Sequence, residues 1–159
     1  MKQSRHLTLK LAAPADAAPI AAMSRDLIET GLPWSWTPER VARNLRQPET
    51  LVLTARDGAS LAGFAIMYFG EQRAHLSLLS VRADCQRQGV ATRMLEWLTE
   101  SALTAGIASI QLELRESNLV ARRFYLKQGF AETLRIPGYY RGMETAVRML
   151  REIRIRPPG

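Results

Sequence analysis

The chain has 159 residues, 47% of them hydrophobic and 23% charged, so it can bury a core and is not intrinsically disordered. No apolar run approaches the length of about 18 residues that a membrane span needs, and residues 1–6 lack the apolar core of a secretion signal. The net charge is +7, but the basic residues are dispersed, which disfavours a dedicated nucleic-acid binder. A dispersed positive surface reflects either the general amino-acid composition of a proteome or attraction to a polyanion. A lone Cys85 excludes an internal disulfide, so we expect a cytoplasmic protein.

The first fifty residues predict one strand and two helices. Residues 7–11 alternate apolar and polar side chains, as a half-buried strand does. Asp16 is placed to cap a helix that ends at Gly31, and Thr37-Pro38-Glu39 opens a second, short helix. The inward residues are expected to be Ile20, Met23, Leu27 and Ile28 in the first helix, and Val41 and Leu45 in the second.

The rest of the chain alternates between strand and helix patterns. Asp57-Gly58 is a hairpin turn signal between strands 51–55 and 61–69. The later elements are expected to be strand 74–81, helix 89–105, strand 107–114, helix 119–128, and strands 130–136 and 146–155. The order β-α-α-β-β-β-α-β-α-β-β contains no linker, so we predict one α/β domain over residues 1–159, with helices on both faces of a mixed sheet.

The connection between strand 74–81 and the following helix has the composition of an anion site. Small residues in Gln86-Arg87-Gln88-Gly89-Val90-Ala91 leave backbone N–H groups open to a phosphate, with the positive end of the helix dipole behind them. Arg87 adds charge, and Thr92 adds a hydroxyl in the first helical turn. The simpler interpretation is an ordinary strand-to-helix turn.

Two motifs at a fixed distance carry a family resemblance. Gln86, Gly89 and Ala91 meet the pattern (Q/R)-x-x-G-x-(G/A), and a second block contains Leu112-Glu113-Leu114-Arg115, Ser117-Asn118, Tyr125, Gly129-Phe130 and Tyr139-Tyr140. The chain thereby resembles the Gcn5-related (GNAT) acyl-CoA N-acyltransferases, and among them the bacterial ribosomal-protein alanine N-acetyltransferases. The resemblance implies the fold of that superfamily, with the fourth and fifth strands splayed apart, and acetyl-CoA as cofactor.

The resemblance also implies which residues bind the coenzyme. Backbone groups of the fourth strand would pair with the pantetheine as another strand does, and the loop would hold the pyrophosphate. Asn118 would contact the coenzyme, although asparagine at a helix start is also a purely structural N-cap. The predicted set is Leu79, Ser80, Val81, Arg87, Gln88, Gly89, Val90, Ala91, Thr92 and Asn118.

Glu113 is the predicted catalytic base. It alternates to the face opposite Leu112 and Leu114, where it is either solvent-facing or placed to take a proton from the attacking amine, directly or through water. An α-amino group has a pKa of about 7.7–8, against about 10.4 for lysine, so a carboxylate assists the α-amine more easily.

Tyr125 is the predicted catalytic acid, because the resemblance implies its role: in the family, a tyrosine at the corresponding position protonates the thiolate of coenzyme A. The alternative is core packing on a helix face.

Two loops rich in aromatic residues are expected to meet the acceptor. The predicted substrate-binding residues are Trp34, Trp36, Tyr139, Tyr140 and Glu144, and the alternative for the aromatic ones is a minor hydrophobic core. Gly142-Met143-Glu144-Thr145 departs from the His-Glu-Asp-like stretch of the ribosomal-protein enzymes.

The sequence therefore predicts an acetyl-CoA-dependent N-acetyltransferase that works by direct attack of the amine. The acceptor is expected to be a protein N-terminal α-amine. A small amine (a polyamine, an aminoglycoside or an amino acid) is the alternative, followed by a non-catalytic acyl-CoA-binding module. We expect no metal, because His6 and His75 stand alone, and no nucleic-acid or membrane partner. The protein is expected to be a monomer or a homodimer.

Overall fold

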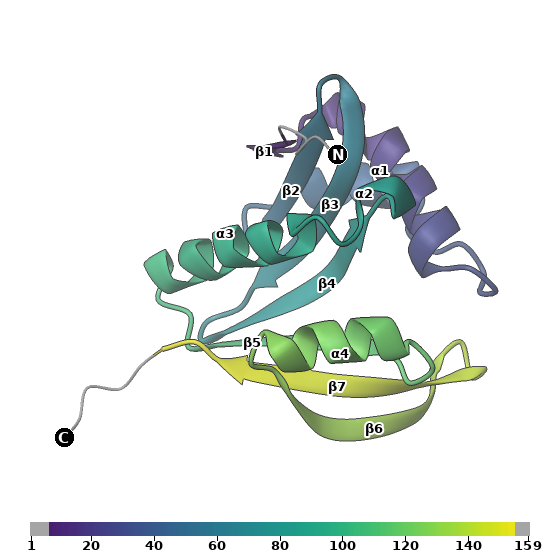
Figure 1. The fold of residues 1–159 in the computed structure, drawn as a ribbon, viewed down its shortest axis with the longest axis vertical. Coiled ribbons are helices and arrows are strands. Elements are labelled where there is room, and N and C mark those ends of the chain that lie inside the picture. Colours follow the sequence, from purple (N-terminus) through teal and green to yellow (C-terminus); the bar gives the residue numbers. More distant parts are fainter. Residues whose placement is uncertain (1–6, 155–159) are drawn as a thin grey trace. The chain divides into compact units, whose positions relative to one another are not determined.

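The computed structural model describes residues 7–154 and confirms the predicted order of elements (Figure 1). The elements are β1 (Leu7–Leu11), α1 (Ala17–Met23), α2 (Pro38–Leu45), β2 (Thr50–Asp57), β3 (Ser60–Phe69), β4 (Arg73–Val81), α3 (Val90–Thr104), β5 (Ser109–Arg115), α4 (Leu119–Lys127), β6 (Ala131–Tyr140) and β7 (Glu144–Glu152). They form a mixed sheet with strand order β1-β2-β3-β4-β5-β7-β6, in which β4 and β5 are parallel. The predicted α/β fold class is thus confirmed.

The chain divides into two compact units. Unit 1 contains Met1–Tyr68 and Leu78–Leu98, and unit 2 contains Phe69–Ser77 and Thr99–Gly159. The single domain over residues 1–159 stays a prediction.

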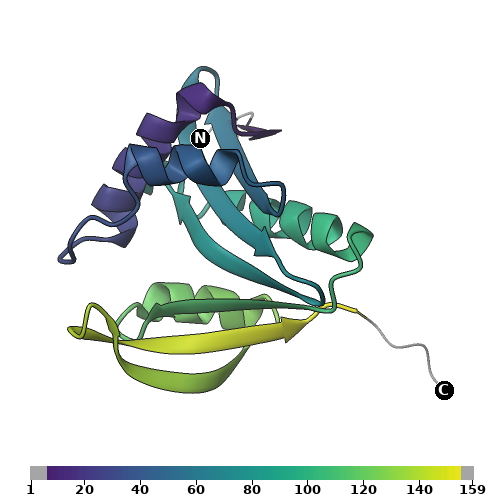
Figure 2. The ribbon, with the colours of Figure 1, turned by 180° about the vertical axis from the view of Figure 1, so that it is seen from behind.

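Unit 1 packs α1 and α2 on one face of β2 and β3, and the first part of α3 on the other face (Figures 1 and 2). Thr37 caps α2 by accepting the Arg40 N–H at 3.3 Å, and Pro38 opens the helix as predicted. Between these helices and the sheet lie the fully buried Ile20, Val41 and Phe64, so the helix faces predicted from periodicity make this core.

Two details predicted for the first helix are wrong. After Met23 the chain forms a π-helical turn, Ser24–Ile28, which inserts an extra residue and rotates the following side chains. Leu27 is consequently exposed instead of facing inward. Asp16 does not cap the helix: its carboxylate accepts the Ala13 N–H at 2.7 Å and forms an ion pair with Arg56 of β2.

Unit 2 is an antiparallel ribbon of β5, β7 and β6 with α4 packed on it (Figure 2). β6 is longer than expected and reaches Tyr140, and β7 begins at Glu144 and ends at Glu152. The prediction that Tyr139, Tyr140 and Glu144 lie in a loop is therefore wrong, because the hairpin continues through them and Tyr140 pairs with Glu144. Ile155, the expected last residue of this strand, lies outside the described residues.

The parallel ladder between β4 and β5 is short. It joins Arg73, Ala74 and His75 to Ser109, Ile110 and Gln111. β5 continues beyond it, paired with β7 from Ser109 to Arg115. The ladder thus ends at His75 and Gln111, two residues before Glu113.

Candidate active site

The predicted phosphate loop of unit 1 has the backbone shape of an anion cradle. Arg87 and Gly89 both adopt positive φ angles, 62° and 77°, immediately before α3 begins at Val90. A left-handed conformation costs a non-glycine residue about 1–2 kcal/mol, so a strained Arg87 is typical of a functional loop. A Cβ placed on Gly89 would meet no atom within 4 Å, which leaves room for a ligand beside this backbone. The loop fits the pyrophosphate of a coenzyme at a helix N-terminus.

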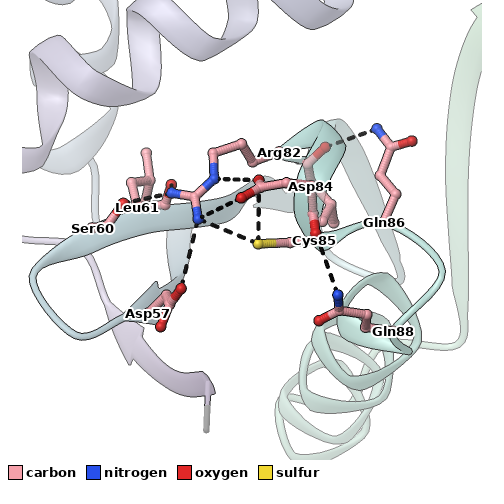
Figure 3. Close-up of polar contacts among 9 residues, drawn as sticks. Asp57, Ser60, Leu61, Arg82, Asp84, Cys85, Gln86 and Gln88 are labelled. Atoms are coloured by element: carbon pink, nitrogen blue, oxygen red, sulfur yellow. Dashed lines mark hydrogen bonds and ion pairs between the residues drawn. The ribbon is translucent and has the colours of Figure 1, made fainter. Parts of the chain in front are cut away.

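Arg82 holds the start of this loop against the β2–β3 hairpin (Figure 3). Its guanidinium donates to Asp84 Oδ1 at 2.6 Å and to the Leu61 carbonyl at 3.1 Å, and it also contacts Ser60 and Asp57. The hydrogen bond that Arg82 donates to Asp84 is the main reason that the Arg82 pKa is raised. A permanently charged residue thus fixes the chain just before the cradle.

Two glutamines brace the loop itself (Figure 3). Gln86 Nε2 donates to the Val81 carbonyl at 3.0 Å, and Gln88 Nε2 donates to the Asp84 carbonyl at 3.3 Å. Gln86, the first residue of the family pattern, therefore ties the loop to the end of β4. Both side chains stabilise the turn and leave the backbone N–H groups near Gly89 as the candidates for phosphate.

The predicted pantetheine-pairing segment, Leu79–Val81, lies at the end of β4. The Gly63 backbone of β3 approaches it so closely that a Cβ on Gly63 would lie 2.8 Å from the Ser80 carbonyl oxygen. Only glycine tolerates that approach without a shift of β4. The position of this segment is thus sensitive to a neighbouring strand that carries no functional side chain.

The Glu113 carboxylate of unit 2 is at the centre of a polar cluster. His75 Nε2 lies 2.5 Å and the Tyr139 hydroxyl 3.2 Å from Oε1. Arg148 Nε lies 2.9 Å and Gln111 Nε2 3.2 Å from Oε2. Of the predicted site residues, the structure therefore brings Glu113 and Tyr139 into contact.

This environment keeps Glu113 ionised. Burial by itself would raise the pKa of the carboxyl, since only 5% of the side chain is exposed. Hydrogen bonds from His75 and Arg148, together with the charge of Arg148 and of the protonated form of His75, outweigh burial and lower the pKa to about 2. A carboxylate with so low a pKa is a weak proton acceptor, so the predicted role of Glu113 as direct base stays a prediction.

The expectation that His75 stands alone is wrong, because its ring contacts Glu113. His75 lies on β4, where it is paired in register with Gln111 of β5, and it contacts Glu113 two residues further along. The spacing of His75 and Ser77, and of Gln111 and Glu113, could have indicated one shared face, because residues two apart project from the same side of a strand. The pairing of two distant strands was the missing information.

Tyr125 lies on α4 and is buried. Its ring makes edge-to-face contacts with Phe124 at 5.1 Å and Phe130 at 5.4 Å between centroids. Burial raises the pKa of its phenol, so the group stays protonated at neutral pH. The core-packing interpretation is thus confirmed, and the catalytic role of the phenol stays a prediction.

The hairpin residues of unit 2 differ in exposure and pairing. Tyr139 is exposed and stacks edge-to-face on Tyr140, with centroids 4.9 Å apart. Glu144 is neutralised by Arg115, whose Nη1 lies 3.2 Å from its carboxylate. Hence Glu144 does not offer an uncompensated negative charge to an acceptor.

The aromatic loop of unit 1 is fixed by a buried carboxylate. Glu29 Oε1 accepts the Ser35 N–H at 2.7 Å and its hydroxyl at 2.5 Å, and the Trp36 N–H is shared between both oxygens. Arginine guanidiniums cover the indole rings: Arg40 lies 3.8 Å from the Trp36 centroid, and Arg25 lies 5.3 Å from that of Trp34. Glu29, which no sequence motif indicated, organises this loop.

Asn118 is the N-cap of α4, because its Oδ1 accepts the Ala121 N–H at 3.1 Å. The structural interpretation of this residue is confirmed, and its contact with the coenzyme stays a prediction. Within residues 7–154, no group of three or more His, Cys, Asp or Glu side chains could hold a metal ion. Across the same part of the chain, every helix is too short or too polar to span a bilayer.

Comparison with known proteins places this site in a family. The model of the acetyltransferase (GNAT) family matches residues 21–130. The [ribosomal protein bS18]-alanine N-acetyltransferase of Salmonella typhimurium is 33% identical over 138 residues, covering 77% of this chain and 92% of that protein. The crystal structure of the Escherichia coli ribosomal-protein-S18-alanine N-acetyltransferase superposes with a TM-score of 0.82, at 27% identity over 97% of this chain and 98% of that one.

An aminoglycoside 6'-N-acetyltransferase complexed with coenzyme A shares the fold, with a TM-score of 0.79 at 18% identity over 95% of this chain and 99% of that one. The matched family region includes the anion cradle, Glu113 and Tyr125. From these matches and this geometry, the chain belongs to the GNAT acetyltransferase family and is an acetyl-CoA-dependent N-acetyltransferase.

Proposed function

We propose that the enzyme acetylates the N-terminal α-amine of a protein. The observation that carries this proposal is the pairing of both candidate acceptor-site carboxylates with arginine: Glu113 with Arg148, and Glu144 with Arg115. This pairing has two consequences, one for the charge and one for the basicity of the acceptor.

The first consequence concerns charge. A polyamine or an aminoglycoside carries several positive charges, and its binding is favoured by carboxylates that no protein cation neutralises. Glu113 and Glu144 are both neutralised within unit 2, and Arg25 and Arg40 cover the aromatic loop of unit 1. These residues favour an acceptor with a single amine over a polycation.

The second consequence concerns basicity. The low pKa of Glu113 leaves the site without a strong carboxylate base, so the acceptor should lose its proton easily. At pH 7, about a tenth of an amine with a pKa of 8 is neutral, against less than about a thousandth of a lysine ε-amine. The α-amine therefore needs far less help. The similarity to bS18-alanine N-acetyltransferases supports the same choice.

The coenzyme is proposed to lie on the cradle of unit 1. Its pyrophosphate would meet the loop residues Arg87, Gln88, Gly89, Val90, Ala91 and Thr92, and its pantetheine the backbone of Leu79, Ser80 and Val81. Asn118 and Tyr125 keep their proposed roles as a coenzyme contact and as the proton donor to the thiolate. Trp34, Trp36, Tyr139 and Tyr140 are proposed to contact the acceptor.

A thiol-release assay with acetyl-CoA tests the acceptor class. The matched probes are an alanine-initiated peptide, the same peptide with a blocked N-terminus and an internal lysine, spermidine, and an aminoglycoside. Release with the free peptide alone, and mass spectrometry that locates the acetyl group on the α-nitrogen, would support the proposal. Release with the small amines alone would replace it by the small-amine alternative. Coenzyme binding by calorimetry without release from any probe would indicate a non-catalytic module.

A further inference from the structure

The Glu113 carboxylate has no lone pair left for an incoming amine. Its two oxygens offer about four acceptor positions. Four donors occupy them: His75 Nε2 and the Tyr139 hydroxyl at Oε1, and Arg148 Nε and Gln111 Nε2 at Oε2. A saturated acceptor that is 95% buried is poorly placed to receive a proton from a substrate.

His75 differs from Glu113 in the exposure of its side chain and in its capacity to accept a proton. Its side chain is 37% exposed, against 5% for Glu113. An ionised carboxylate only accepts hydrogen bonds, so Nε2 carries the proton in the 2.5 Å contact. The lone pair of the neutral ring then lies on Nδ1. The neighbour of Nδ1 is Ser77 Oγ at 3.4 Å, a contact longer than those that surround Glu113.

We propose that His75 Nδ1 takes the proton from the acceptor amine, and that Glu113 acts through His75 as a positioning residue. This inference rests on the proposed transfer to an amine and adds the atom that accepts the proton. Glu113 fixes the tautomer and stabilises the imidazolium that forms, as the carboxylate does in other carboxylate–histidine pairs.

The protons balance across the reaction. An ammonium nitrogen loses two protons in becoming an amide nitrogen. His75 Nδ1 takes the first and releases it to water; the nitrogen lone pair then forms the C–N bond to the acetyl carbon, and the C–S bond breaks. After attack, the deprotonated Nδ1 takes the second proton and releases it to water, while Tyr125 gives its proton to the thiolate and regains one from water, so that each turnover releases one net proton.

The charged and titratable groups around His75 come from four strands, its own included. Glu113 on β5 favours the imidazolium, whereas Arg148 on β7 opposes it, and Tyr139 on β6 is a neutral donor to the same carboxylate. On the strand of His75 itself, Arg73 donates to the Gln111 side chain at 2.9 Å.

The first test is the pH dependence of His75→Gln. The glutamine amide can still donate to Glu113 but has no basic atom. At pH 7, kcat with the best amine should fall about 100-fold, with KM for acetyl-CoA unchanged. The deficit should shrink toward pH 9, where an α-amine is already neutral. The control is Glu71→Gln, an exposed residue before β4, which should match the wild type. A deficit that stays the same at all pH values would show a structural role and overturn the proposal.

The second test reads the ring directly in the free protein. Long-range ¹H–¹⁵N NMR spectra, with the His75→Gln variant for assignment, should show His75 as the Nε2–H tautomer. Glu113→Gln should abolish that preference. A predominant Nδ1–H tautomer, or full activity of His75→Gln beside an inactive Glu113→Gln, would assign the base to Glu113. Both tests use whichever amine the wild type accepts, so they do not depend on the acceptor class.

Discussion

Replacing Glu29 with glutamine tests whether one buried carboxylate organises the aromatic loop. The carboxylate accepts from the Ser24 hydroxyl at 2.9 Å, from the backbone N–H and hydroxyl of Ser35, and from the Trp36 N–H. In Glu29→Gln, the remaining side-chain oxygen still accepts from Ser35. The NH₂ group that replaces the other oxygen can only donate, so it faces a second donor, the Trp36 N–H. The loop that carries Trp34 and Trp36 should then loosen.

The magnitude follows from the loss of charge. A hydrogen bond to a charged group contributes about 1.5–3 kcal/mol, against about 0.5–1.5 kcal/mol for a neutral pair. About three bonds lose their charge here, and relief from burying that charge offsets part of the loss. We therefore expect Glu29→Gln to lower the free energy of unfolding by about 2–3 kcal/mol at pH 7, and the Tm by about 4–10 °C.

The effect should depend on pH. Burial raises the pKa of Glu29, but hydrogen bonds from Ser35, Ser24 and Trp36 outweigh it, so the folded pKa lies below the ordinary value. The stabilisation is complete above the unfolded pKa of about 4.3 and is lost as the pH falls through the lower folded value. The difference between wild type and variant in urea unfolding should be constant above about pH 5 and narrow below about pH 4.

A matched control is Glu49→Gln, the same change at an exposed carboxylate, which should alter stability by less than about 0.5 kcal/mol. A Glu29→Gln variant as stable as this control would refute the reasoning, and so would a deficit that persists unchanged at pH 3. If the loop also contacts the acceptor, KM for the amine should rise while the affinity for coenzyme stays unchanged.

Three further substitutions probe the rest of the site. Gly63→Ala should weaken coenzyme binding several-fold in calorimetry and cost about 1–3 kcal/mol of stability, because the new Cβ would lie 2.8 Å from the Ser80 carbonyl. Tyr125→Phe should lower kcat about 100-fold while the folded state stays within about 1 kcal/mol of the wild type in urea unfolding. Arg148→Met should raise the pKa of Glu113, now about 2, and cost about 1–3 kcal/mol at pH 7, a deficit that shrinks as the pH falls toward 2.

Each of these substitutions has a contradicting outcome. Undiminished coenzyme affinity in Gly63→Ala would show that Leu79–Val81 does not hold the pantetheine. Wild-type kcat in Tyr125→Phe would leave that residue a purely structural role. For Arg148→Met, a deficit that does not change between pH 7 and pH 2 would show that loss of packing, and not loss of the ion pair, destabilises the variant.

Much of this fold could be predicted from local patterns in the chain. Thr37 and Pro38 mark the start of α2, and the alternation of Ile110, Leu112 and Leu114 marks β5, because capping and side-chain periodicity are local properties. The glycine of the cradle could be predicted too, since a positive φ before a helix favours that residue.

Local patterns could not predict the π-helical turn. Periodicity assumes a constant rotation per residue, and one inserted residue at Ser24–Ile28 turns Leu27 outward. The extension of β6 and β7 through Tyr140 and Glu144 had the same origin, because a hairpin ends where cross-strand pairing ends, and pairing is not a local property.

The chemistry of the site was likewise decided in part by local sequence and in part by tertiary structure. Alternation in the strand placed the Glu113 side chain opposite Leu112 and Leu114, and the family resemblance indicated it as the candidate base. Its burial, its low pKa and its contact with His75 were decided by tertiary structure. The two residues are 38 positions apart in the chain, and only the parallel pairing of β4 with β5 brings them to 2.5 Å.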